Sequence, residues 1–499
     1  MVQTRGTFRE GGISGAASWV ALMGALVAAG SCRGLEKATG QSPAAVLRVG
    51  LGQAPTNPQN GVRQITMNLS VESLGRLAED GRVEPQLADK WTLGRDGRSL
   101  TVTLKHGVSF HDGSPVNART VSPLLPAAMK TFAGPVFDDI ESITPGGDDA
   151  IEMRFRKPSP LLLEALEVQI RKPGAAIIST GAFMSDPASP NVLRANAGYY
   201  GGRPQLVEVD ISSYPSVRTA WAELLRNRID MLYEVGPDAL DSLESSTNIA
   251  VFKFTRRYQY AIILNTNAPA LRSSAVRRAL NLGIDRDQLV RRALNAHGLP
   301  SSSPVWPRYW AADASMMALD FDAEQAATLL KSAHVRFTCD VPSDQLYERV
   351  ALEAKRQLAA VGVDMEVRPA TQDEIFERQR TGKFEALLFE VISGPTMLRP
   401  YQLWHSKGAQ NPGSLGNATV DAAFDRVRQA DDEAQFKAAV AGVQQAFRDD
   451  PPALFLVWTE RARAVSQRFA VPEPEPGADV LRTLRMWTPR NDRTFANRN

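Results

Sequence analysis

The residue types that most often perform catalysis do not fall into a catalytic pattern in this chain. The 499-residue sequence has no G-x-S-x-G nucleophile motif, no G-x-x-x-x-G-K-[ST] phosphate loop and no H-E-x-x-H zinc pair. Its five histidines, at positions 106, 111, 297, 334 and 405, lack the spacing of metal ligands. We therefore predict that the protein is not an enzyme and that it uses neither a metal ion nor a cofactor.

A site that binds a solute without changing it needs different residues. It requires a cleft lined by aromatic surface and a few polar groups, which a hinge motion between two lobes then closes. Buried hydrogen bonds and charge pairs discriminate strongly between ligands once water is excluded. The elements that would build such lobes are therefore the next features to find in the sequence.

The stretch from Gly81 to Val121 holds a regular succession of turns and strands. Arg95-Asp96-Gly97 predicts a tight turn, because Gly97 accepts a positive φ and Asp96 can bond to its own downstream backbone. The segment 99–104 alternates polar and apolar residues, which predicts a strand. A second turn at 111–115 leads into a predicted helix.

This stretch resembles the signature of the family 5 extracellular solute-binding proteins, the peptide and nickel receptors of bacterial ABC importers. That signature joins a G-x-x-x-P-x-L-A-x-x-W run, a D-G hairpin and an L-(basic)-x-G-V-x-F-x-D-G-x-P run. The matching positions are Gly81, Pro85, Leu87, Ala88, Trp91, Asp96, Gly97, Leu104, Gly107, Val108, Phe110, Asp112, Gly113 and Pro115. We interpret Trp91 and Phe110 as core aromatics and not as ligand contacts.

Three later segments, 196–204, 258–286 and 417–428, resemble the same family. The resemblance implies an α/β, two-lobed periplasmic-binding-protein fold, with an extra subdomain in the first lobe and hinge strands between the lobes. Lobe I would comprise 46–264 plus 478–499, including a signature subdomain at about 61–180. Lobe II would comprise 265–477.

Local patterns predict several individual elements. Apolar residues at helical spacing predict a helix from Val62 to Leu77, and the continuous apolar run Phe384–Ile392 predicts a buried strand. Asn227 stands where the family has a glycine at a helix end, and asparagine tolerates the positive φ needed there.

Position relative to the family gives the candidate cleft lining: the loop after the first strand, two tyrosines before the lobe crossing, and the segment 393–404. The candidate ligand-binding residues are Gln53, Thr56, Asn57, Tyr258, Tyr260, Ser393, Arg399, Tyr401 and Trp404. For any one of these aromatics, packing in the core is the alternative to ligand contact.

One departure from the family bears on the ligand. Peptide-binding members carry a tryptophan and then an acidic residue after the strand that corresponds to Phe384–Ile392, and the acid pairs with the peptide's α-ammonium. The segment 393–399 has neither residue, and Arg399 would favour an anionic group instead. We therefore expect an amphipathic or anionic solute and not a classical dipeptide. A nickel chelate stays open, although no histidine pattern supports it.

The first 31 residues have the features of an export signal. Arg5 and Arg9 precede the apolar run 16–29, which is shorter than the roughly 20 residues of a membrane-spanning helix. Small residues before Cys32 resemble a lipoprotein cleavage site, with Ala29 in place of the usual leucine. We predict that Cys32 is acylated and that 32–45 forms a tether; cleavage leaving a free thiol is the alternative.

Charge and cysteine content limit the possible partners. The chain has 57 Lys+Arg and 55 Asp+Glu, a net charge of +2, which argues against a nucleic-acid partner. Acylation of Cys32 would leave Cys339 as the remaining cysteine, so no internal disulfide is expected.

Together these features predict a lipid-anchored receptor on the periplasmic or extracytoplasmic face of a bacterial membrane. It would capture a peptide-like or other amphipathic or anionic solute by lobe closure and deliver it, as a monomer, to the permease of an ABC importer. A ligand sensor of the same fold that is not coupled to transport is the alternative.

Overall fold

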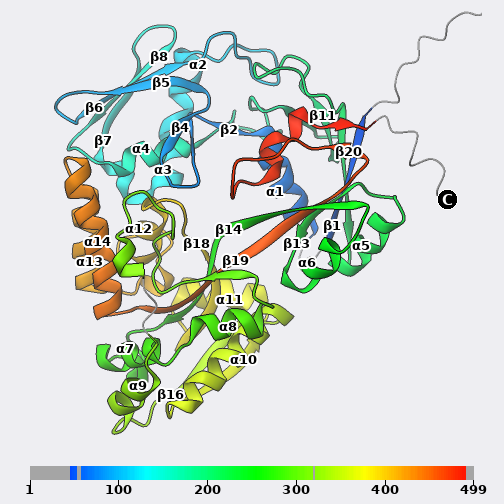
Figure 1. Ribbon diagram of the computed structural model, residues 1–499. Coiled ribbons are helices and arrows are strands. Elements are labelled where there is room, and N and C mark those ends of the chain that lie inside the picture. The colour runs from blue at the N-terminus through cyan, green and yellow to red at the C-terminus, as the bar shows by residue number, and fades with distance from the viewer. Residues whose placement is uncertain (1–44, 53–57, 318–320, 491–499) are drawn as a thin grey trace, which may run out of the picture. The chain divides into compact units, whose positions relative to one another are not determined.

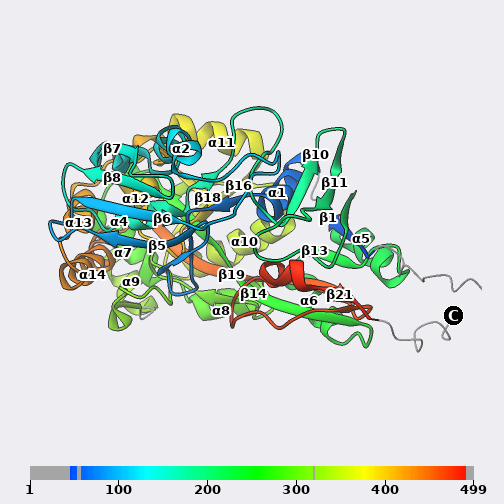
Figure 2. The ribbon, with the colours of Figure 1, turned by 90° about the horizontal axis from the view of Figure 1, so that it is seen from above.

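The computed structural model describes residues 45–52, 58–317 and 321–490, which form a mixed α/β protein (Figures 1 and 2). Within these residues no helix combines the length and the apolar character needed to cross a membrane. The predicted export signal, Cys32 and nearly all of the tether lie outside the described residues. The same is true of Gln53, Thr56 and Asn57.

One large sheet joins strands from both ends of the chain. Its order is β10 (Phe183–Asp186), β11 (Ser189–Ala195), β12 (Glu208–Tyr214), β1 (Val46–Gly52), β13 (Met231–Val235), β19 (Ala453–Ser466), β14 (Ile249–Leu264), β18 (Ala386–Ile392), β16 (Arg336–Pro342) and β17 (Asp364–Ala370), with β15 (Gly298–Pro300) paired to β19. Strand β1 runs parallel to β12 and β13, and β16 runs parallel to β17 and β18. Two groups of parallel strands, each flanked by helices, are typical of an α/β protein.

The strands β14 and β19 connect these two parallel groups. They contain 16 and 14 residues and pair with each other in antiparallel fashion over most of their length. Strand β19 pairs with β13 of the first group, whereas the last seven residues of β14 pair with β18 of the second. The register shifts between Thr255 and Gln259, midway along β14. These two long strands are therefore the natural candidates for the predicted hinge.

The signature stretch contributes the first two strands of an antiparallel sheet of order β5 (Ala88–Leu93), β6 (Ser99–Leu104), β8 (Ala150–Phe155) and β7 (Ile140–Pro145). The predicted turn and strand are confirmed: Gly97 has a φ of 64°, and alternate residues of β6 are fully buried. Phe110 is also buried, as predicted for a core aromatic, whereas Trp91 is only partly buried.

The predicted helix from Val62 to Leu77 is correct only as far as Ser70. Helix α1 (Pro58–Ser70) ends there, and the chain continues as β2 (Glu72–Ser73) and β3 (Gly75–Leu77). These strands pair with β9 (Gln169–Ile170) and β4 (Val83–Pro85). Gly75 allows β3 to approach β4 closely, because a Cβ at this position would lie 2.6 Å from the Val83 side chain. Strand pairing therefore overrides the helical pattern beyond Ser70.

The other α-helices are α2 (Ala118–Val121), α3 (Leu125–Ala133), α4 (Leu161–Glu164), α5 (Val217–Leu225), α6 (Pro237–Glu244), α7 (Ser274–Leu282), α8 (Arg286–Ala293), α9 (Ala323–Leu330), α10 (Gln345–Ala360), α11 (Gln372–Thr381), α12 (Leu398–Trp404), α13 (Ala418–Gln429) and α14 (Glu433–Asp449). Short 3₁₀ turns include η3 (Ala165–Glu167) and η7 (Val480–Met486), and β20 (Phe469–Ala470) pairs with β21 (Thr488–Pro489). Asn227 has a φ of 56°, as predicted, and β18 forms the predicted buried strand.

Candidate ligand-binding cleft

A polar cavity of about 420 Å³ lies where α1, β14 and η7 meet the loops that carry Gly181 and the pair Tyr199–Tyr200. Its volume falls in the range of small-molecule sites, which is roughly 300–1,000 Å³. Segments far apart in the sequence supply its walls, from Asn68 in α1 to Arg485 in η7. The cavity can therefore hold a small solute.

Positive charge dominates the lining of this cavity. Five cationic side chains face two carboxylates; they are Arg76, Lys105, Arg257, Arg482 and Arg485, with Glu72 and Glu167 as the acids. Arg76 pairs with Glu84 at 2.9 Å, and Arg482 Nη2 lies 3.6 Å from Glu79. In the described part of the chain, however, the Arg485 guanidinium has no carboxylate within salt-bridge distance, and Arg482 Nη1 is buried without a hydrogen-bond partner. An anionic ligand would satisfy these donors.

Glu72, one of the two acids, already accepts hydrogen bonds from other side chains of the protein. Its side chain is buried and accepts hydrogen bonds from Thr180 Oγ1 at 2.7 Å, Tyr199 OH at 2.7 Å and Tyr200 OH at 3.0 Å. Burial raises the pKa of Glu72, although these three hydrogen bonds and Lys105 oppose the rise. Glu72 therefore fixes both tyrosines of the N-A-G-Y-Y segment and does little to offset the positive charge.

Arg257 brings the middle of β14 to this cavity. Its guanidinium donates to Leu77 O at 3.0 Å and to Glu167 Oε1 at 3.4 Å, and Glu79 lies 3.6 Å away. Burial lowers the pKa of Arg257, and the neighbouring guanidinium of Arg482 adds to this effect against the pull of Glu167 and Glu79. A negative charge arriving here would stabilise an already crowded group of cations.

Arg399 adds a further cation next to Arg257. It lies in α12, the helix that follows β18 of the second parallel group. Its Nη2 donates to Glu167 Oε2 at 2.8 Å, so Glu167 holds both Arg399 and Arg257. Of the residues that sequence analysis selected, Arg399 is thus placed beside the cavity through a shared carboxylate. Tyr258 is partly buried and lies 4.5 Å from the Arg256 guanidinium.

Four other selected residues lie in the protein interior. Tyr260 packs edge-on against Tyr347 at 4.7 Å, and Trp404 packs against Phe455 at 5.2 Å. Tyr401 stacks on His405 at 4.7 Å and accepts a hydrogen bond from Arg428. Ser393 is fully buried, and its hydroxyl has no partner in the described structure. Packing accounts for the three aromatics, and none of the four lines the cavity.

A second charged group connects the strands that form the candidate hinge. Arg256 Nη1 lies 2.9 Å from both carboxylate oxygens of Glu390 and 3.7 Å from Glu234, while Arg461 Nε lies 3.3 Å from Glu234. Burial opposes a charge on Glu234, but Arg256, Arg461 and Arg463 outweigh it and lower its pKa to about 2. Four strands are thereby joined, namely β13, β14, β18 and β19. The adjacent Arg256 and Arg257, in the middle of a long strand, are the sequence signal that could have indicated this charged group.

His297 links α6 to the middle of β19. Its Nε2 lies 3.0 Å from Asp241 Oδ1, and its Nδ1 lies 2.8 Å from Glu460 Oε2. Burial works against a charged ring, but the hydrogen bonds to Glu460 and Asp241 outweigh it and raise the pKa of His297. Both ring nitrogens donate when the imidazole is protonated, so both bonds form best in the charged state.

We expect this contact to make stability depend on pH. A raised folded-state pKa gives stability that is present below the unfolded value of about 6.5 and is lost as pH rises through the folded value. The wild type should lose up to about 1 kcal/mol of unfolding free energy relative to His297→Gln across this range. Urea unfolding from pH 5.5 to 8.5 measures it, with the exposed His106→Gln variant as control. Parallel pH profiles for wild type and His297→Gln would contradict the assignment.

The fold and the cavity together define a class of protein. Two groups of parallel strands joined by two long strands, with a polar cavity beside one of them, are the arrangement of a bilobal binding protein. The model of the bacterial extracellular solute-binding proteins, family 5 Middle, matches residues 82–413. The chain belongs to this family and is an extracytoplasmic solute-binding protein.

Curated relatives are similar at low identity over most of the chain. Protein XP55 of Streptomyces lividans is 25% identical over 438 residues, covering 79% of this chain and 80% of that protein. The nickel-binding periplasmic protein of Escherichia coli K12 is 22% identical, covering 68% and 74%. The oligopeptide-binding protein AppA of Bacillus subtilis is 21% identical, covering 84% and 86%.

Solved structures have the same fold. NikZ from Campylobacter jejuni, in complex with Ni(L-His), aligns with a TM-score of 0.76 at 19% identity, covering 89% of this chain and all of that one. AgaA from A. tumefacien R10, in complex with agropinic acid, aligns with a TM-score of 0.75 at 17% identity, covering 90% and 99%. The predicted family and fold class are confirmed.

Proposed function

We propose that this protein is the receptor of an ABC importer, and that it captures a small anionic or amphipathic solute in the cavity between α1, β14 and η7. The surplus of cations in the lining carries this proposal, above all Arg257, Arg482 and Arg485. The agropinic acid complex of AgaA is consistent with an acidic ligand in this fold. Charge-assisted hydrogen bonds from guanidinium groups would provide the affinity.

The two lobes predicted from the sequence would allow the protein to enclose a solute in this cavity. With β14 and β19 as hinge strands, closure would press Arg399 against a solute in the cavity, because Glu167 of the lining already holds Arg399 beside Arg257. Enclosing the solute removes water from these charged contacts and strengthens them. A closed complex then presents one surface to a permease. Acylation of Cys32 would keep the receptor close to that permease.

A thermal-shift screen of the purified protein tests the ligand class. We expect small carboxylates such as succinate, glutarate or hippurate to stabilise the protein. A ligand at one hundred times its Kd adds about 2.7 kcal/mol to the unfolding free energy. Dipeptides such as Ala-Ala, matched in concentration, should have little effect, because the acidic partner for an α-ammonium is missing. Stabilisation by dipeptides and not by any carboxylate would overturn the proposal.

A further inference from the structure

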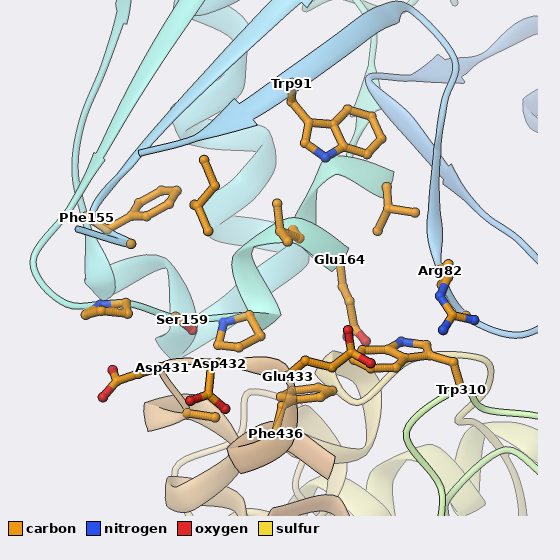
Figure 3. A pocket seen from close by; sticks show the side chains of 18 of the residues that line it. Arg82, Trp91, Phe155, Ser159, Glu164, Trp310, Asp431, Asp432, Glu433 and Phe436 are labelled. Atoms are coloured by element: carbon orange, nitrogen blue, oxygen red, sulfur yellow. The ribbon is translucent and has the colours of Figure 1, made fainter. Parts of the chain in front are cut away.

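A second pocket, of about 370 Å³, lies between the signature subdomain and the start of α14 (Figure 3). One wall comes from the subdomain, with Trp91, Phe155 and Leu163. The opposite wall comes from Trp310 and Phe436, whose rings stack at 5.4 Å with an interplanar angle of 15°. The body of this pocket is therefore apolar and aromatic, in contrast to the cation-rich cavity described above.

One polar group on the pocket wall lacks a partner. Ser159 is only 8% exposed, and its hydroxyl has no hydrogen-bond partner in the described structure. It lies on the pocket wall that faces Asp431 and Asp432 (Figure 3). A buried hydroxyl without a partner costs about 1–3 kcal/mol, so a ligand that bonds to it recovers part of that cost. The nearby Glu164 carboxylate, by contrast, already accepts hydrogen bonds from the protein.

The rim of the pocket is negatively charged. Asp431, Asp432 and Glu433 follow one another at the start of α14 and reach the pocket together (Figure 3). Asp432 caps the helix through Gln435 N, and Glu433 pairs with Lys437 at 2.7 Å. In the described chain no cation lies within salt-bridge distance of the Asp431 carboxylate, which is therefore available to a ligand.

The cations near the pocket are already neutralised. Arg82 lies 5.2 Å from the Trp310 ring centroid and pairs with Asp80 at 2.6 Å, while Lys437 pairs with Glu433. The local charge thus remains negative, and aromatic faces attract cations. Walls of aromatic rings with a carboxylate at the rim are complementary to an apolar body that carries a positive group.

We propose that this pocket is a binding site for a small organic cation with an apolar body, of the arylalkyl-ammonium class. The ring would lie between Leu163 and the Trp310–Phe436 stack, the ammonium group would reach Asp431, and one N–H would donate to Ser159 Oγ. The site is independent of the cleft and takes a ligand of opposite charge. An occupant would also contact the signature subdomain and α14 at once.

Calorimetric titration with 2-phenylethylammonium chloride, compared with neutral 2-phenylethanol, tests this site. We expect the ammonium compound to bind at least tenfold more tightly, and the difference to shrink as salt is raised. Asp431→Asn should weaken ammonium binding three- to fivefold. The matched control is Asp373→Asn, which neutralises an exposed first-turn carboxylate of α11 and should change nothing.

Two further variants separate the pocket from the cleft. Leu163→Trp fills the pocket and should abolish ammonium binding. Ser159→Ala should weaken ammonium binding two- to fivefold, and it provides the test if the larger tryptophan side chain of Leu163→Trp unfolds the protein. Arg257→Gln should leave ammonium binding intact even if the cleft ligand is lost. Equal affinity for the alcohol and the ammonium, no saturable binding, or loss of binding in Arg257→Gln would each overturn the proposal.

Discussion

The Glu164→Ala variant is expected to unfold with a free energy at least about 3 kcal/mol below that of the wild type. The Glu164 carboxylate is 5% exposed and accepts hydrogen bonds from Tyr309 OH at 2.6 Å, Thr396 Oγ1 at 2.5 Å, Met397 N at 3.0 Å and Leu398 N at 2.8 Å. Alanine would leave three of these donors buried without an acceptor, since Leu398 N also donates to Thr396 Oγ1 at 3.0 Å. Urea unfolding followed by tryptophan fluorescence measures the loss.

Two controls make this prediction specific. Glu164→Gln keeps the shape but turns one oxygen into a donor, so it should fall between wild type and alanine. Glu152→Ala removes an exposed carboxylate from β8 of the same subdomain and should cost within about 0.5 kcal/mol. A Glu164→Ala variant as stable as Glu152→Ala would show that the four hydrogen bonds contribute nothing net.

Arg482→Gln is expected to weaken binding of the carboxylate that gives the largest thermal shift by at least tenfold, and Arg257→Gln by a similar factor. Both side chains line the cavity, and both donate to the Leu77 carbonyl from opposite ends of the sequence. Losing one charge-assisted hydrogen bond costs about 1.5–3 kcal/mol, which is at least tenfold in Kd. Titration calorimetry at constant ionic strength measures the change.

The matched control for these two variants is Arg228→Gln. Arg228 is exposed, pairs with Glu223 of α5 and does not line the cavity. The Arg228→Gln variant therefore removes one positive charge, as Arg482→Gln does, but at a site outside the cavity. Its Kd should equal the wild-type value within twofold. If Arg228→Gln weakens binding as much as Arg482→Gln, the effect comes from overall charge, and the cavity is not the site.

The fold could be predicted because its signals are local in the sequence. The alternation in β6, the positive φ of Gly97 and the positive φ of Asn227 depend on residues a few positions apart. The helix predicted to Leu77 failed for the opposite reason. Beyond Ser70 the backbone hydrogen bonds go to β9 and β4, which lie far along the chain or after a turn.

The candidate cavity was harder to predict, because its residues meet only in three dimensions. Arg257 and Arg482 are separated by more than two hundred residues, and no pattern in either segment indicates their proximity. The burial of individual aromatic residues was also not evident from the sequence. Tyr401 and Trp404 follow the strand where the family binds ligands, yet packing of α12 against its neighbours places both in the core.

The distance between the two predicted lobes, with and without solute, decides whether the protein captures its ligand by hinge closure. Dyes on Arg218→Cys in α5 and Arg380→Cys in α11 would report it by energy transfer, in a Cys32→Ser background where Cys339 is buried. We expect a saturating carboxylate to shorten this distance in the wild type and to have no effect in Arg257→Gln. An unchanged distance while calorimetry shows binding would contradict capture by hinge closure.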